Sequence, residues 1–100
     1  RPLSRMMRVR FSELALADLE AIAAYISQDS PAAARRVINR IEELCAKLAA
    51  VPGMGRVSEL PPARKLVVSP WRYKIIYEID EQARQVVILR VYHGARNLPY

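Results

Sequence analysis

The side chains that could do chemistry lie in the last third of this 100-residue sequence, around its single histidine. His93 stands in the final segment RVYHGARNLPY, which ends with Tyr100. Either residue could be the general acid or base of metal-free RNA cleavage, in which a 2′-hydroxyl loses its proton and the leaving oxygen gains one. Cations would bind the phosphate and stabilise the charge developing on it. Six are candidates for binding a phosphate or a target: Arg64, Lys65, Arg72, Lys74, Arg90 and Arg96.

The same residues have simpler interpretations. A sheet face exposed to water needs polar side chains, so a row of Arg and Lys is also typical of an ordinary solvated surface. A lone histidine at the end of a strand is more often structural than catalytic. The tail is therefore a cleavage site, a docking surface for a larger target, or a solvated terminus.

No other class of catalytic site is indicated. His93 and Cys45 are too far apart in the sequence to form a metal-binding motif. The segment GMGR has two glycines, but no strand–helix unit of a phosphate-binding loop surrounds it. We therefore expect neither a metal nor a cofactor.

Composition and charge limit the possible classes of protein. Apolar residues make up 52% of the chain, which is typical of a packed domain rather than a disordered one. The net charge of +6 favours an acidic partner, either nucleic acid, the ribosome or an acidic protein. The single cysteine cannot build a disulfide framework, so we expect a cytoplasmic protein. No secretion signal is recognisable, and no apolar run approaches the ~20 residues of a membrane span.

The N-terminal half predicts a strand followed by a helical hairpin. Residues 8–11, RVRF, alternate charged and apolar side chains as a half-buried strand does. Ser12 can cap a helix that runs to about Ser27. Ser30, followed by a proline, starts a second helix that runs to about Ala50. The short link between the helices makes them antiparallel.

The C-terminal half changes to the two-residue period of strands. Strands are expected at residues 63–68, 72–79 and 85–92, with links short enough for an antiparallel meander. The predicted fold class is α+β, with an N-terminal strand and an antiparallel helical hairpin packed on a small antiparallel sheet. We expect one domain over residues 7–100, with residues 1–6 being upstream of the natural start or vector-derived.

The middle strand of this meander predicts which sheet face is buried. Alternate residues point to opposite faces of a strand. The large apolar set forms the core face: Trp71, Tyr73, Ile75, Tyr77 and Ile79. The other face is expected to be wet and largely basic, and carries Arg72, Lys74, Ile76 and Glu78. Cys45 is expected to be a small core residue in the second helix.

The order of these elements and motifs resembles the RelE/ParE superfamily, the toxins of bacterial type II toxin–antitoxin pairs. The resemblance covers nearly the whole chain from Met7. Its most specific parts are the PGMGR loop at 52–56, the strand at 73–77 and the tail at 90–96. The loop and the HGAR segment look closer to the ParE branch.

The two branches imply different activities on one fold. The RelE branch cuts mRNA in the ribosomal A site, whereas the ParE branch poisons DNA gyrase. Lys65 and Tyr100 fall where the RelE branch keeps a Lys and a Tyr, and Lys74 stands where it has an Arg. Gly94 replaces another catalytic Arg, which favours the ParE branch. Some ribosome-dependent relatives use a His near this tail, so His93 keeps the endonuclease alternative open.

The resemblance also implies partners. A cognate ParD-like antitoxin would form a hetero-oligomer with this chain, with an amphipathic helix and an extended arm across the hairpin and the sheet. An acidic arm would complement the positive charge. DNA gyrase is the expected target, with the ribosome and mRNA as the alternative, and a non-toxic antitoxin-binding relative is a third possibility. No membrane partner is expected.

Overall fold

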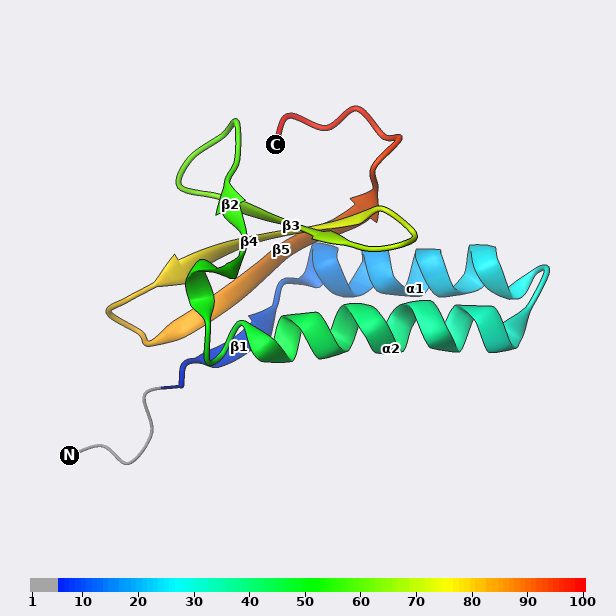
Figure 1. Ribbon diagram of the computed structural model, residues 1–100, viewed down its shortest axis with the longest axis horizontal. Helices are drawn as coiled ribbons and strands as arrows, with labels where there is room; N and C mark the ends of the chain where they lie inside the picture. Colours follow the sequence, from blue (N-terminus) through cyan, green and yellow to red (C-terminus); the bar gives the residue numbers. More distant parts are fainter. Residues whose placement is uncertain (1–5) are drawn as a thin grey trace.

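The computed structural model describes residues 6–100, in which two helices cover one face of a five-stranded sheet (Figure 1). The expectation for residues 1–6 therefore falls, except for Met6, outside the described residues. Within residues 6–100 no helix has the length and apolar character to cross a membrane. In chain order the elements are β1 (Arg8–Phe11), α1 (Glu13–Ser27), α2 (Pro31–Lys47), a 3-10 turn η1 (Pro52–Met54), β2 (Arg56–Val57), β3 (Arg64–Val68), β4 (Tyr73–Asp80) and β5 (Gln85–His93).

The helical hairpin forms where the capping residues predicted it. The hydroxyl oxygen of Ser12 accepts a hydrogen bond from the Ala15 amide at 3.0 Å, and that of Ser30 accepts one from the Ala33 amide at 3.1 Å. Each bond satisfies an amide that has no partner inside the helix. The second helix ends at Lys47 rather than about Ala50, because the Lys47 carbonyl accepts the amides of residues 50 and 51 and closes the helix in a turn.

The sheet is mixed, with strand order β1-β5-β4-β3-β2. The three predicted antiparallel strands are confirmed as β3, β4 and β5. The sheet has one more strand at each edge than the predicted meander, and only the pairing of β1 departs from a purely antiparallel arrangement. β1 pairs in parallel with β5, and residues 56–57 add a short antiparallel edge strand beside β3. Local periodicity misses the parallel pair because its strands are separated by both helices and most of the sheet.

The core lies between the helices and the inner face of the sheet, as predicted. Tyr73, Ile75 and Tyr77 of β4 are buried there, whereas Trp71 and Ile79 are only partly buried against the same cluster. Burying such large side chains supplies most of the driving force for folding a small domain.

The outer face of the sheet is not uniformly wet, which corrects the expectation. Ile76 is fully buried on this face with Ala63 and Tyr92, and Leu98 and Tyr100 of the C-terminal tail pack against them. The tail folds back on the side of the sheet away from the helices (Figure 1). Alternation along β4 identifies the face correctly but cannot show that a later segment covers it.

Candidate functional site

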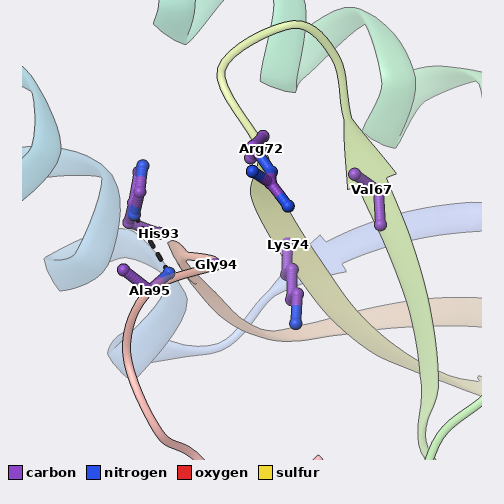
Figure 2. A pocket seen from close by; sticks show the side chains of 6 residues that line it. All are labelled: Val67, Arg72, Lys74, His93, Gly94 and Ala95. Atoms are coloured by element: carbon purple, nitrogen blue, oxygen red, sulfur yellow. Dashed lines mark hydrogen bonds between the residues drawn. The ribbon is translucent and has the colours of Figure 1, made fainter.

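A cationic hollow of about 280 Å³ lies where the β3–β4 turn meets the end of β5. Figure 2 shows Arg72 and Lys74 close together on one side, with His93 across from them beside α1. The hollow is lined by Val67, Arg72, Lys74, His93, Gly94 and Ala95. The structure thus brings together two of the predicted cations and the predicted histidine.

The floor of this hollow depends on a close approach of two backbone segments. The Gly94 amide donates to the Arg72 carbonyl at 2.8 Å, and a Cβ at residue 94 would lie only 2.8 Å from that same oxygen. Arg72 itself has a φ of 66°, in the left-handed region that non-glycine residues rarely adopt. A side chain at residue 94 would therefore push the tail away from the β3–β4 turn.

His93 is exposed, but its ring is fixed on two sides. The ring stands edge-on to Tyr73, with centroids 5.3 Å apart and planes at 88°. Its Nδ1 accepts a hydrogen bond from the Ala95 amide at 3.1 Å (Figure 2). Because an accepting nitrogen carries no proton, the neutral ring holds its proton on Nε2. That nitrogen is the one able to donate to a bound partner.

A second hollow, of about 560 Å³, lies on the helix side of the tail. Its lining includes Tyr25 and Asp18 from α1, which the sequence reasoning did not select, together with Tyr73, His93 and Arg96. His93 therefore borders both hollows. One signal for Asp18 was present in the sequence: this acid lies three residues after Ala15 and four before Ile22, a spacing that puts it on the same helix face as these two apolar residues. In the structure that face packs against the core.

Lys65 and Tyr100 are joined in a contact on the outer face. The Lys65 ammonium, only 5% exposed, donates to the Glu59 carboxylate at 3.1 Å and to the main-chain oxygen of Tyr100 at 2.8 Å. The bond from Lys65 lowers the pKa of the Glu59 carboxyl. Burial, followed by the nearby Tyr100, raises the pKa of Tyr92. Lys65 thus holds the end of the tail onto the sheet.

The two predicted acid–base residues are not brought together. Tyr100 packs with Tyr92 on the outer face, whereas His93 packs on Tyr73, a member of the inner core. Consecutive residues of β5 point to opposite faces, so the sheet separates the imidazole from the phenol.

Arg64 and Arg90 also serve internal contacts. The Arg64 guanidinium donates to the Gly55 carbonyl at 2.7 and 3.0 Å, which holds the PGMGR loop against β3. Arg90 forms a two-pronged ion pair with Asp18, at 2.9 and 3.0 Å, and this bond raises the pKa of Arg90. Such paired geometry is the strong form of a charged hydrogen bond.

The six predicted cations therefore fall into two groups. We call Arg64, Lys65 and Arg90 the bound cations, because each holds two parts of the fold together. We call Arg72, Lys74 and Arg96, together with His93, the open rim. Among residues 6–100, the three cationic side chains of the open rim form no hydrogen bond or ion pair. In the same range, no group of three or more His, Cys, Asp or Glu residues could hold a metal ion.

Comparison with known proteins gives relatives over almost the full chain. The Y4kP protein of Sinorhizobium fredii is 39% identical over 92% of this chain and 93% of its own length. Toxin RelE2 of Caulobacter vibrioides is 38% identical over 91% of this chain and 99% of its own length.

Solved structures show the same fold. A chain of the chromosomal ParDE toxin–antitoxin system from P. aeruginosa superposes with a TM-score of 0.76 at 30% identity, covering 90% of this chain and 98% of the other. A chain of the E. coli RelBE toxin–antitoxin complex gives 0.69 at 15% identity, covering 90% and 99%, and so shows the fold alone. The family model for the ParE toxin of the type II toxin–antitoxin system parDE matches residues 9–98. With that match over most of its length, the chain belongs to the ParE toxin family within the RelE/ParE superfamily of type II toxin–antitoxin systems.

Proposed function

We propose that this toxin arrests growth by binding DNA gyrase through the open rim, without cutting RNA itself. The observation that carries the proposal is the separation of His93 from Tyr100 by the sheet. Cleavage of RNA without a metal needs a base and an acid at the same phosphate, within hydrogen-bond reach of the reacting atoms. Here the His93 imidazole and the Tyr100 phenol lie on opposite faces of the sheet.

The bound cations support the same proposal. Lys65, which stands where the RelE branch keeps a Lys, is buried under the tail and bonded to Glu59 and Tyr100. Gly94 leaves no room for the Arg of that branch unless the turn at Arg72 shifts. Of the six cations predicted from the sequence, only the three of the open rim have side chains without a hydrogen bond or ion pair to another residue in the range 6–100.

A cognate antitoxin is the second proposed partner. The similar P. aeruginosa chain belongs to a ParDE system. The chain carries an excess of six positive charges, which would attract an acidic antitoxin arm. The carboxylates of that arm would form their strongest new hydrogen bonds with Arg72, Lys74 and Arg96 of the open rim, because these side chains have no internal partner within residues 6–100. Because gyrase and ribosomes are cytoplasmic targets, we infer that the toxin and the hetero-oligomer with its antitoxin are cytoplasmic too.

The deciding experiment is a gyrase cleavage assay. Purified toxin without antitoxin is incubated with DNA gyrase, ATP and supercoiled plasmid, and linear DNA trapped as cleaved complex is scored. We expect linear DNA that requires gyrase and disappears when antitoxin is added first. Failure to trap DNA at high toxin excess, from protein that still arrests growth, would contradict the proposal.

Ribosome-dependent mRNA cleavage is the alternative, and one observation favours it. His93 lines a single hollow together with Arg72 and Lys74, so a possible acid–base group and two cations that could bind phosphate are close together. Under this alternative, toxin added to translating ribosomes cuts mRNA, and His93→Ala abolishes cutting. A non-toxic relative would instead leave colony counts unchanged when expressed alone.

A further inference from the structure

A bulge in β5 decides which way its last residues point. In the register with β4, Tyr77 is opposite Ile88 and Ile76 is opposite Arg90, so Leu89 has no partner. Ile88 and Val91 both face the core although two residues, not one, separate them. An extra residue in one strand of an antiparallel pair has this effect, since it shifts the alternation of every residue that follows.

The functional residues lie downstream of that shift. With an unbroken strand, Tyr92 would share the inner face with Ile88, and His93 would point outward. With the bulge, Tyr92 packs under the tail on the outer face, and His93 reaches Tyr73 on the helix side. The bulge therefore places the histidine of the open rim on the helix side of the sheet.

The bulge is held by α1 and by the residue that caps it. The Ser12 hydroxyl donates to the Leu89 carbonyl at 2.9 Å, and the Asp18 carboxylate accepts the Val91 amide at 2.8 Å. Bulges leave main-chain groups without their ladder partners, and such groups are costly to bury unpaired. Here the carbonyl of the unpartnered Leu89, and the amide of Val91 two residues later, are satisfied from sequence positions more than 70 residues away.

Asp18 has the central position in this arrangement. Its two oxygens accept three hydrogen bonds, two from the Arg90 guanidinium and one from the Val91 amide. The side chain of Asp18 is only 11% exposed, so water competes little for these bonds. The carboxylate thereby fixes both residues that follow the unpaired Leu89. Asp18 also borders the hollow that contains His93 and Arg96.

We propose that Asp18 is a positioning residue for the toxin's target-binding tail. By holding the bulge of β5 it selects the face on which His93 lies, and with it the geometry of the open rim. Asp18 does not need to touch the target. The effect on gyrase rests on the proposed function, whereas the effect on the position of His93 does not.

The structural test compares Asp18→Asn with Glu20→Gln, an exposed acid-to-amide change on the same helix. In the wild type and in Glu20→Gln, NMR should show a nuclear Overhauser effect between the rings of His93 and Tyr73, which stand 5.3 Å apart. In Asp18→Asn this signal should be lost, and the Val91 amide should exchange faster with solvent. An unchanged His93–Tyr73 signal in folded Asp18→Asn protein would overturn the proposal.

Two further variants separate positioning from general stability. Ile41→Val trims the core from α2 without touching these bonds, and should lower the melting temperature while the ring signal stays. Arg90→Gln removes the ion pair but leaves the bond from Asp18 to Val91, and should weaken the signal only in part. If Asp18→Asn does not fold, an unchanged signal in Arg90→Gln overturns the proposal in its place.

The functional test uses the same proteins at equal folded concentration. Asp18→Asn should need about tenfold more toxin than Glu20→Gln to trap the same amount of linear DNA with gyrase. If the wild type traps none, the proposed function fails, and growth arrest replaces gyrase as the readout for Asp18. A lost ring signal with undiminished toxicity by both readouts would overturn the role of Asp18 in toxicity.

Discussion

The open rim and the bound cations use the same residue types on neighbouring strands for different purposes. Lys65 on β3 is almost fully buried and joins Glu59 to the tail, whereas Lys74 on β4 lines a hollow and has no ion pair among the described residues. A buried ammonium must be fully bonded to be tolerated, and its bonds then hold the fold. An unpaired cation contributes little to folding and keeps its charge available to a partner.

The difference teaches that charge alone does not identify a binding surface in this family member. In the sequence, Arg64 and Arg90 would count toward a basic patch, yet in the fold their guanidinium groups already donate to carbonyls of the PGMGR loop and to Asp18. A partner that drew these side chains away from their present positions would break those internal bonds. Contacts made by the open rim require no such loss.

The largest loss of stability should come from removing Tyr77, which ties the PGMGR loop, where Arg64 is also bonded, to the core. The Tyr77 hydroxyl donates to the Pro52 carbonyl at 2.7 Å and accepts the Gly55 amide at 2.8 Å, while its ring is fully buried. Tyr77→Ala should reduce the free energy of unfolding by about 3–5 kcal/mol, enough to unfold much of a domain this small. Tyr25→Ala, at a tyrosine 73% exposed, is the matched control. Urea unfolding followed by circular dichroism measures both, and equal midpoints would contradict the assignment of the core face.

The two lysines give a direct test of the comparison. Lys65→Met should lower the free energy of unfolding by about 1–3 kcal/mol, because the tail loses its charged hydrogen bond. Lys74→Met should change it by less than about 0.5 kcal/mol, as surface substitutions usually do. The effects on toxicity should be reversed: per folded molecule, Lys74→Met should be less toxic than Lys65→Met. Equal losses of stability in the two variants would remove the distinction between bound and open cations.

Arginines of the open rim should affect toxicity without affecting folding. Arg72→Ala and Arg96→Ala should each require about tenfold more toxin for the same growth arrest, equivalent to about 1.4 kcal/mol of binding free energy. Their melting temperatures should stay near that of the wild type, since neither side chain has an internal partner within residues 6–100. Unchanged killing by both variants at equal expression would exclude the open rim from the mechanism.

The smallest effect is expected at Cys45, which belongs neither to the bound cations nor to the open rim and therefore tests only the assignment of the core. Burial raises the pKa of its thiol from 9.0 to about 12. The unfolded thiol ionises first as the pH rises, so its contribution to stability is present below pH 9 and is lost toward pH 12. The stability difference between wild type and Cys45→Ala should therefore shrink from pH 7 to pH 10. Rapid modification of the folded protein by a thiol reagent at pH 7 would contradict the core assignment.

Much of the framework could be predicted from local signals. The serine caps at 12 and 30 gave the starts of both helices, and alternation along β4 gave the buried face with Tyr77 at its centre. The sequence resemblance gave the toxin superfamily, which the family match over residues 9–98 confirms. The site residues at the open rim remain predictions that the experiments above test.

Tertiary structure decided how these parts are used. The sequence by itself determined the helical hairpin, the three long strands and the cationic character of the tail, because caps and periodicity act between near neighbours. Only the fold decided that Lys65 is covered, that His93 and Tyr100 lie on opposite faces, and that β5 carries a bulge. The physical reason is distance along the chain: the bulge is stabilised by bonds from Ser12 and Asp18, more than 70 residues away, and no local pattern in β5 records them.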